Sequence, residues 1–233
     1  MIDAAGRRLP ADIAWERLVP SWPLLVALAV FGRLLAARLA LLNDPDTYLH
    51  IATGRWILAH GALPVQDPFS HSMPGASWIS SEWLAQIVLA AVYDQFGWGG
   101  VVVLAAASVA LAIGLLTRFL LRRLPALPTL VAAVAAIALL QPHCLARPHV
   151  LALPLLVLWS GALLRARDED RLPPFGLLPV MALWANLHGS FLFGLGSPPF
   201  SPPRPSGRRL ADFAAPRLCG GRRLSSGPSS PRC

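Results

Sequence analysis

Five long apolar segments decide which folds this chain can adopt. They cover about residues 22–42, 101–121, 127–140, 148–164 and 175–195. A helix needs about 20 mostly apolar residues to cross a lipid bilayer, and most of these segments approach that length. Only 14% of the 233 residues are charged, whereas 55% are hydrophobic. We therefore predict an all-α, polytopic transmembrane helix bundle with about five spans.

The arginines indicate how such a bundle is oriented. Short loops rich in Arg stay in the cytoplasm. The arginine clusters that follow the second and fourth segments share that side if residues 1–20 form a cytoplasmic N-terminus. Residues 82–96 must then form a helix that lies in the outer interface without crossing, separated from the next span by Gly97. This scheme makes residues 21–196 a multi-pass transmembrane region with an outer loop over residues 43–100.

The net charge of +8 does not indicate nucleic-acid binding by the body of the chain. Residues 197–233 contain seven Arg and one acid, whereas residues 1–196 contain thirteen Arg and eleven acids. The excess charge therefore belongs mainly to the tail, and we expect no nucleic-acid partner. The three cysteines have no metal-ligand spacing, so we predict neither a disulfide framework nor a zinc site.

The tail over residues 197–233 differs from the rest of the chain. It is rich in Pro, Arg and Ser, has no apolar periodicity, and contains eight prolines. This composition predicts disorder. It is also typical of a GC-rich gene read in the wrong frame, so one hypothesis is a frameshift near Gly196. The alternative is a genuine basic tail.

Polar residues gather in three stretches that the predicted topology places on the same outer face. They belong to the loop after the first span, to the connection between the third and fourth spans, and to the outer half of the last span. In chain order they are Asp44, Asp46, His50, Arg55, Glu82, Arg147, His149, Asn186 and His188. Polar and ionisable residues within apolar segments mark functional sites or buried hydrogen bonds. We expect these residues to form one site.

Structural alternatives remain open for several of these residues. Asp46 could cap a helix that begins at Thr47, and Glu82 could cap the interfacial helix. Arg55 could pair with lipid headgroups. Arg33 interrupts the first span at an insertion cost of about 2.5–3.5 kcal/mol, so it either faces the bundle or lines a site for an anionic group.

Several motifs together resemble a known family. They are Asp44-Pro-Asp-Thr-Tyr-Leu-His50, Gly54-Arg-Trp-Ile-Leu58, His60-Gly61, Asp67-Pro-Phe-Ser70, Glu82-Trp-Leu84, Arg147-Pro-His149 and Trp184-Ala-Asn-Leu-His-Gly189. Over about residues 20–196 the chain resembles bacterial C-type membrane glycosyltransferases, which are similar to dolichyl-phosphate-mannose mannosyltransferases and to the lipid A aminoarabinose transferase. The resemblance implies a multi-pass protein of the bacterial inner membrane.

The resemblance also implies a reaction. The donor would be a polyprenyl-phosphate-linked sugar, and the acceptor would be an envelope molecule on the outer face. Asp44 or Asp46 would be the general base, and Arg147 with His149 or His188 would neutralise the leaving phosphate. No cofactor is certain, although the two acids could instead bind a divalent cation. The alternatives are a non-enzymatic membrane protein that binds or moves a lipid-linked glycan, and a truncated, inactive fragment.

Overall fold

The computed structural model describes residues 21–196, and these residues form helices joined by turns and loops. The expected cytoplasmic N-terminus, residues 1–20, and the expected disordered tail, residues 197–233, lie outside the described residues. In chain order the helices are α1 (Trp22–Ala36), α2 (Arg38–Leu41), α3 (Asp46–His60), α4 (Trp83–Leu120), α5 (Ala126–Leu140), the 3-10 helix η1 (Gln141–His143), α6 (Pro148–Asp168), α7 (Leu177–Leu187) and α8 (Phe191–Leu195). Within this part of the chain there is no strand, only an isolated bridge between Gln66 and Ser77.

The predicted all-α membrane bundle is confirmed. Among residues 21–196, three helical segments are long and apolar enough to cross a bilayer: α4, α5 continued by η1, and α6. The apolar helices α1 and α7 are shorter, at 15 and 11 residues. In α5 the side chains of Leu127, Val131 and Leu139 are exposed although the helix carries no charged residue. An apolar helix that leaves such side chains uncovered is suited to contact with lipid, so the chain is a membrane-embedded protein.

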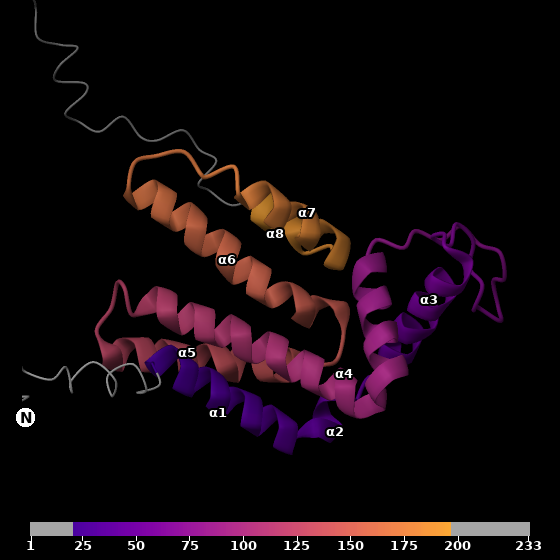
Figure 1. Cartoon of the computed structure of the whole chain (residues 1–233), viewed down its shortest axis with the longest axis horizontal. Coiled ribbons are helices and arrows are strands. Elements are labelled where there is room, and N and C mark those ends of the chain that lie inside the picture. The colour runs from indigo at the N-terminus through magenta and orange to yellow at the C-terminus, as the bar shows by residue number, and fades with distance from the viewer. Residues whose placement is uncertain (1–20, 197–233) are drawn as a thin grey trace, which may run out of the picture. The chain divides into compact units, whose positions relative to one another are not determined.

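Helix α4 is two helices joined at Gly97, as the sequence predicts. Gly97 has φ 61° and ψ −157°, a conformation that residues with a side chain rarely adopt. The part before Gly97 lies against α3, and the part after it runs beside α1, α5 and α6 (Figure 1). One sharp turn thus separates the helical pair formed by α3 and the start of α4 from the long helices of the bundle.

Close packing holds α3 against the first part of α4. A Cβ atom built on Gly54 would lie 2.0 Å from the backbone oxygen of Gln86 and 2.7 Å from Cβ of Ala90. Only glycine therefore permits this approach. Because α3 carries Asp46 and His50, its position on α4 also sets where these polar side chains lie.

The core of the bundle follows one face of the second part of α4. Val101, Ala105, Val109 and Ile113 recur every four residues and are all fully buried. They share a cluster with residues of α1 and α6, including Val150. Small and β-branched residues on one helical face allow neighbouring helices to approach closely, and van der Waals packing is the main attraction between helices in lipid.

Two helix boundaries differ from the predicted spans. The first span is interrupted at Ala37, after which α2 forms a single turn. Near this break the exposed Arg33 donates a hydrogen bond to Oε1 of Gln141 at 2.9 Å, which links α1 to η1. Helix α6 continues to Asp168 rather than ending at residue 164, because arginine has a high helix propensity and Arg165 and Arg167 extend the helix beyond its apolar part.

The prediction of one continuous last span over residues 175–195 is wrong. Helix α7 ends at Leu187, His188 is extended, and the chain turns back into α8. Polar groups stabilise the turn: the indole of Trp184 donates to Oγ of Ser190, and the backbone N–H of Ser190 donates to Nδ1 of His188. The fully buried Trp184 packs against Gly194 of α8. The two short helices therefore form a hairpin against α6.

Candidate functional site

Three segments that are far apart in the sequence meet at the end of the bundle that carries α3. Two hydrogen bonds join the first two segments: the N–H of Ala146 donates to the carbonyl oxygen of Leu41 at 2.8 Å, and Oγ1 of Thr47 donates to that of Ala146 at 3.1 Å. Both link residues about a hundred positions apart, and Thr47 is fully buried. The start of α3 and the connection between η1 and α6 are thus held together by uncharged hydrogen bonds as well as by charge.

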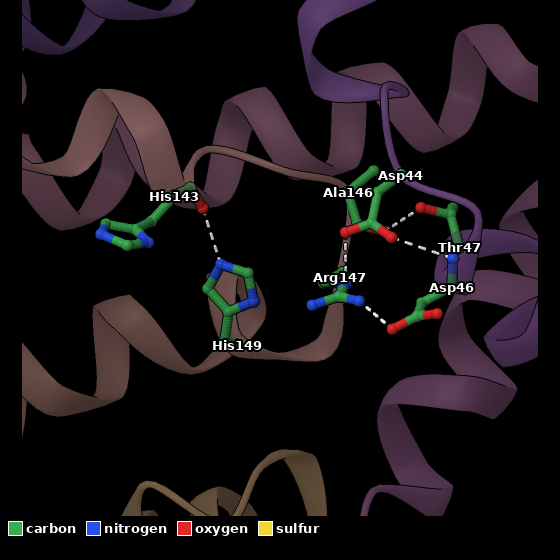
Figure 2. Close-up of polar contacts among 7 residues, drawn as sticks. All are labelled: Asp44, Asp46, Thr47, His143, Ala146, Arg147 and His149. Carbon is green, nitrogen blue, oxygen red and sulfur yellow. Dashed lines mark hydrogen bonds and ion pairs between the residues drawn. The ribbon is translucent and has the colours of Figure 1, made fainter.

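Arg147 lies between the two acids of the first segment (Figure 2). Its Nε atom is 2.6 Å from Oδ2 of Asp44, and its Nη2 atom pairs with Oδ2 of Asp46. The side chain of Asp44 is only 8% exposed, whereas that of Asp46 is 51% exposed. The two carboxylates therefore share one cation, but only Asp46 is open to a substrate.

Asp44, rather than Asp46, accepts a hydrogen bond at the start of α3. The helix begins at Asp46, and Oδ1 of Asp44 accepts a hydrogen bond from the N–H of Asp46 at 2.9 Å. The alternative that Asp46 caps a helix starting at Thr47 is therefore wrong. Asp44 combines this bond with its contact to Arg147, which accounts for its burial.

Histidines and Glu82 line the same region. Nε2 of His149 lies 2.7 Å from the carbonyl oxygen of His143, and because a carbonyl only accepts, this nitrogen carries the proton (Figure 2). The rings of His149 and His188 are 6.0 Å apart, measured between centroids. Nε2 of His188 lies 3.3 Å from Oε1 of Glu82, and burial raises the pKa of this carboxyl group. The third predicted segment thus joins the site through His188.

Asn186 has a different role from the other predicted site residues. Its Oδ1 accepts a hydrogen bond from Nε1 of Trp83 at 2.7 Å, and its Nδ2 donates to the carbonyl oxygen of Ala182 at 2.7 Å. Both groups of the amide are therefore engaged by the protein. Asn186 fastens the end of α7 to the start of α4.

Arg55 does not join the other predicted residues. Its Nε donates to Oδ1 of Asp94 at 2.7 Å, and its guanidinium group lies 4.9 Å from the centre of the Tyr93 ring. Asp94 and Tyr93 belong to the first part of α4, so Arg55 links α3 to that helix. We therefore assign Arg55 to the packing of α3 against the first part of α4 and not to the site.

The sequence interpretation missed two residues of the site, Thr47 and His143. Thr47 directly follows Asp46, and His143 belongs to the connection that precedes Arg147. Thr47 donates a hydrogen bond through its hydroxyl group, and His143 supplies a carbonyl oxygen that accepts one. Both bonds orient neighbouring groups. The periodicity of apolar residues in the sequence does not predict such hydrogen bonds.

The acids are not arranged as a metal site. Within residues 21–196 there is no group of three or more His, Cys, Asp and Glu side chains placed to hold a metal ion. The position between the carboxylates of Asp44 and Asp46 is taken by the guanidinium group of Arg147. A fixed cation of the protein, with a single positive charge, thus occupies the position between the two acids.

Burial governs the charge of His50. It lowers the pKa of His50 to about 4, an effect that His149 and His188 reinforce and that Asp44 opposes. Among the described residues its buried Nδ1 atom has no hydrogen-bond partner. His50 is therefore neutral at pH 7 and offers the site a nitrogen that can donate or accept, without adding charge.

We predict that His50 gains its proton only near pH 4, which an NMR titration of histidine-labelled protein in detergent measures. Because its pKa is lower in the folded chain than the ordinary value of 6.5, the unfolded chain binds the proton first. The stability that neutral His50 contributes is complete above about pH 6.5 and is lost as the pH falls from 6.5 towards 4. The variant His50→Gln should lose this pH-dependent part of the stability. A titration of His50 near pH 6.5 would contradict its burial.

No protein family model matches the chain, and neither a curated protein nor a solved structure matches it. Its function must therefore be inferred from the residues of the site.

Proposed function

We propose that this protein transfers a sugar from a polyprenyl-phosphate-linked donor to a hydroxyl group of an envelope acceptor, at the outer face of the bacterial inner membrane. The observation that carries the proposal is the pairing of a half-exposed carboxylate, Asp46, with Arg147 at the end of a membrane bundle. A carboxylate can remove the acceptor proton, and arginine can hold the phosphate. A carboxylate base and an arginine for the phosphate are also the groups that the resemblance to C-type glycosyltransferases implies.

Asp46 is the better base of the two acids. The acceptor hydroxyl must come within hydrogen-bond distance of the base, and Asp46 is exposed enough to allow this, whereas Asp44 is buried. In the reaction the acceptor oxygen forms a bond to the anomeric carbon while the bond from that carbon to the phosphate oxygen breaks. The proton passes to the carboxylate of Asp46, and the electron pair leaves with the polyprenyl phosphate. Direct attack inverts the configuration of the sugar.

Arg147 can serve the donor without leaving Asp44. A guanidinium group has five N–H donors, of which Nε faces Asp44 and Nη2 faces Asp46. A donor phosphate would compete with Asp46 for the Nη groups, because arginine binds phosphate and carboxylate in the same geometry. Donor binding would thus release Asp46 from its ion pair and make it a stronger base when the acceptor arrives.

The distribution of arginines supports the proposed orientation. The connections between α4 and α5 and between α6 and α7 lie at the end of the bundle opposite to α3 (Figure 1). That end carries Arg122, Arg123 and Arg167. Since short loops rich in arginine stay in the cytoplasm, the end with Asp46 would face outward, as a lipid-linked donor on the outer leaflet requires.

One observation favours a second candidate, a protein that binds or moves a lipid-linked glycan without reacting. Both carboxylates are paired with Arg147, and a paired carboxylate is a weaker base than a free one. A site that keeps this pairing when the donor is bound would hold the phosphate but would not remove a proton.

The two candidates differ in turnover. Vesicles containing the full chain are given a series of polyprenyl-phosphate-linked sugars and an envelope extract as acceptor, and the freed polyprenyl phosphate is measured. Sugar transfer predicts release that depends on both the protein and the acceptor. Donor binding without release would instead support the non-enzymatic candidate.

A further inference from the structure

A second polar site lies at the arginine-bearing end of the bundle, away from Asp46. A cavity of about 250 Å3 opens between the ends of α4 and α6. One water needs about 10–15 Å3 of such space, so the cavity can accept a group much larger than water. It is lined by Leu115, Arg118, Phe119 and Arg122 from α4 and the turn that follows it, and by Val157, Leu158, Gly161 and Arg165 from α6.

The cavity has a charged rim above an apolar wall. Arg118 and Arg122 are one helical turn apart, as are Gly161 and Arg165, so both pairs lie on faces that line the cavity. The side chains nearer the middle of the two helices are Leu115, Val157 and Leu158. Cationic groups at the membrane surface followed by apolar groups within the membrane match the two parts of a phospholipid.

The arginines of the cavity lack acidic partners in the part of the chain that the structure describes. Neither Arg118 nor Arg122 forms an ion pair there, and Nε of Arg165 donates only to the carbonyl oxygen of Gly161, at 3.3 Å. Arginines just outside the cavity are different, since Arg123 pairs with Asp168 and Arg171 pairs with Glu169. Asp168 and Glu169 therefore neutralise arginines outside the cavity, and the three arginines that line it leave it positive.

We propose that this cavity binds the phosphate headgroup of an anionic membrane phospholipid, with its acyl chains along the apolar wall between α4 and α6. Basic pockets between transmembrane helices on the cytoplasmic side bind anionic headgroups, and arginine forks fit phosphate oxygens. The site is independent of sugar transfer and would bind its lipid in the opposite leaflet from the donor.

The test is native mass spectrometry of the full chain in detergent with phosphatidylglycerol or phosphatidylcholine of identical acyl chains. We expect the unmodified protein to retain phosphatidylglycerol in preference to phosphatidylcholine. The double variant Arg118→Gln/Arg122→Gln should bind phosphatidylglycerol about tenfold more weakly or worse, since each arginine near anionic lipid contributes to the attraction. The matched control is Arg167→Gln/Arg171→Gln, which removes the same charge at the same end of the bundle outside the cavity. The affinity of this control variant for phosphatidylglycerol should change little.

Two outcomes would overturn the proposal. Equal losses in both double variants would show that diffuse surface charge, and not the cavity, attracts the lipid. Displacement of phosphatidylglycerol by millimolar inorganic phosphate would show that the site takes a free anion and that the apolar wall contributes nothing. Bound lipid that resists inorganic phosphate and depends on Arg118 and Arg122 supports the assignment.

Discussion

Replacing Asp46 by asparagine is expected to slow sugar transfer by about 10²–10⁴-fold, the usual contribution of a general base. The amide has nearly the same shape but cannot accept the acceptor proton. Because Arg147 keeps its contact with Asp44, the variant should still bind a polyprenyl-phosphate-linked sugar. The measurement is the rate of polyprenyl phosphate release in vesicles, together with donor binding by the same preparation.

Asp94→Asn is the matched control for this change. Asp94 is also a half-exposed carboxylate paired with an arginine, but it contacts Arg55 of α3 and not the site. Its variant should transfer sugar at nearly the unmodified rate. If Asp44→Asn abolishes transfer while Asp46→Asn does not, the buried acid is the base, and if both variants remain active, neither acid has this role.

Arg147→Leu is expected to lower the free energy of unfolding by about 3 kcal/mol, towards the lower limit for breaking a buried ion pair because Arg147 is partly exposed. The cost comes mainly from Asp44, which is buried and would lose Arg147, its cationic partner within residues 21–196. The exposed carboxylate of Asp46 contributes little, because water can solvate it. Denaturant unfolding of the protein in detergent micelles measures the change.

A double variant separates charge from packing in this prediction. In Arg147→Leu/Asp44→Asn the buried charge is absent, and the asparagine oxygen can still accept the hydrogen bond from the N–H of Asp46. We expect this variant to recover much of the lost stability while sugar transfer stays absent. Strictly additive losses in the double variant would show that Asp44 and Arg147 are not coupled.

The features that the sequence predicts well are those that depend on local composition. Apolar length identifies the long helices, and the run of glycines at Gly97 locates the break in α4 because a positive φ strongly favours glycine. The meeting of the three polar segments also follows from topology, since short connections on one side of a bundle must lie near one another. These inferences need no knowledge of individual contacts.

The remaining features depend on contacts between distant residues. Asp44 and Asp46 share Arg147, which lies about a hundred residues away, and the Asp-x-Asp pattern gives no sign of this shared contact. The reversal at His188 interrupts a segment that is apolar on both sides, so hydropathy gives no sign of it. The sequence places Arg55 in the polar loop after the first span, together with the site residues, but on α3 it reaches Asp94 instead.

Binding of polyprenyl phosphate to Arg147→Gln and Arg55→Gln, compared with the unmodified protein, tests the location of the site most directly. This group is common to all proposed donors, so neither the sugar nor the acceptor needs to be known. Excess phosphatidylglycerol in the membranes would occupy the cavity near Arg118 and leave the site at Asp46 to be measured. The account predicts a loss of about tenfold or more for Arg147→Gln, as expected for a charge-assisted phosphate contact, and little change for Arg55→Gln. Equal binding by both variants would contradict it.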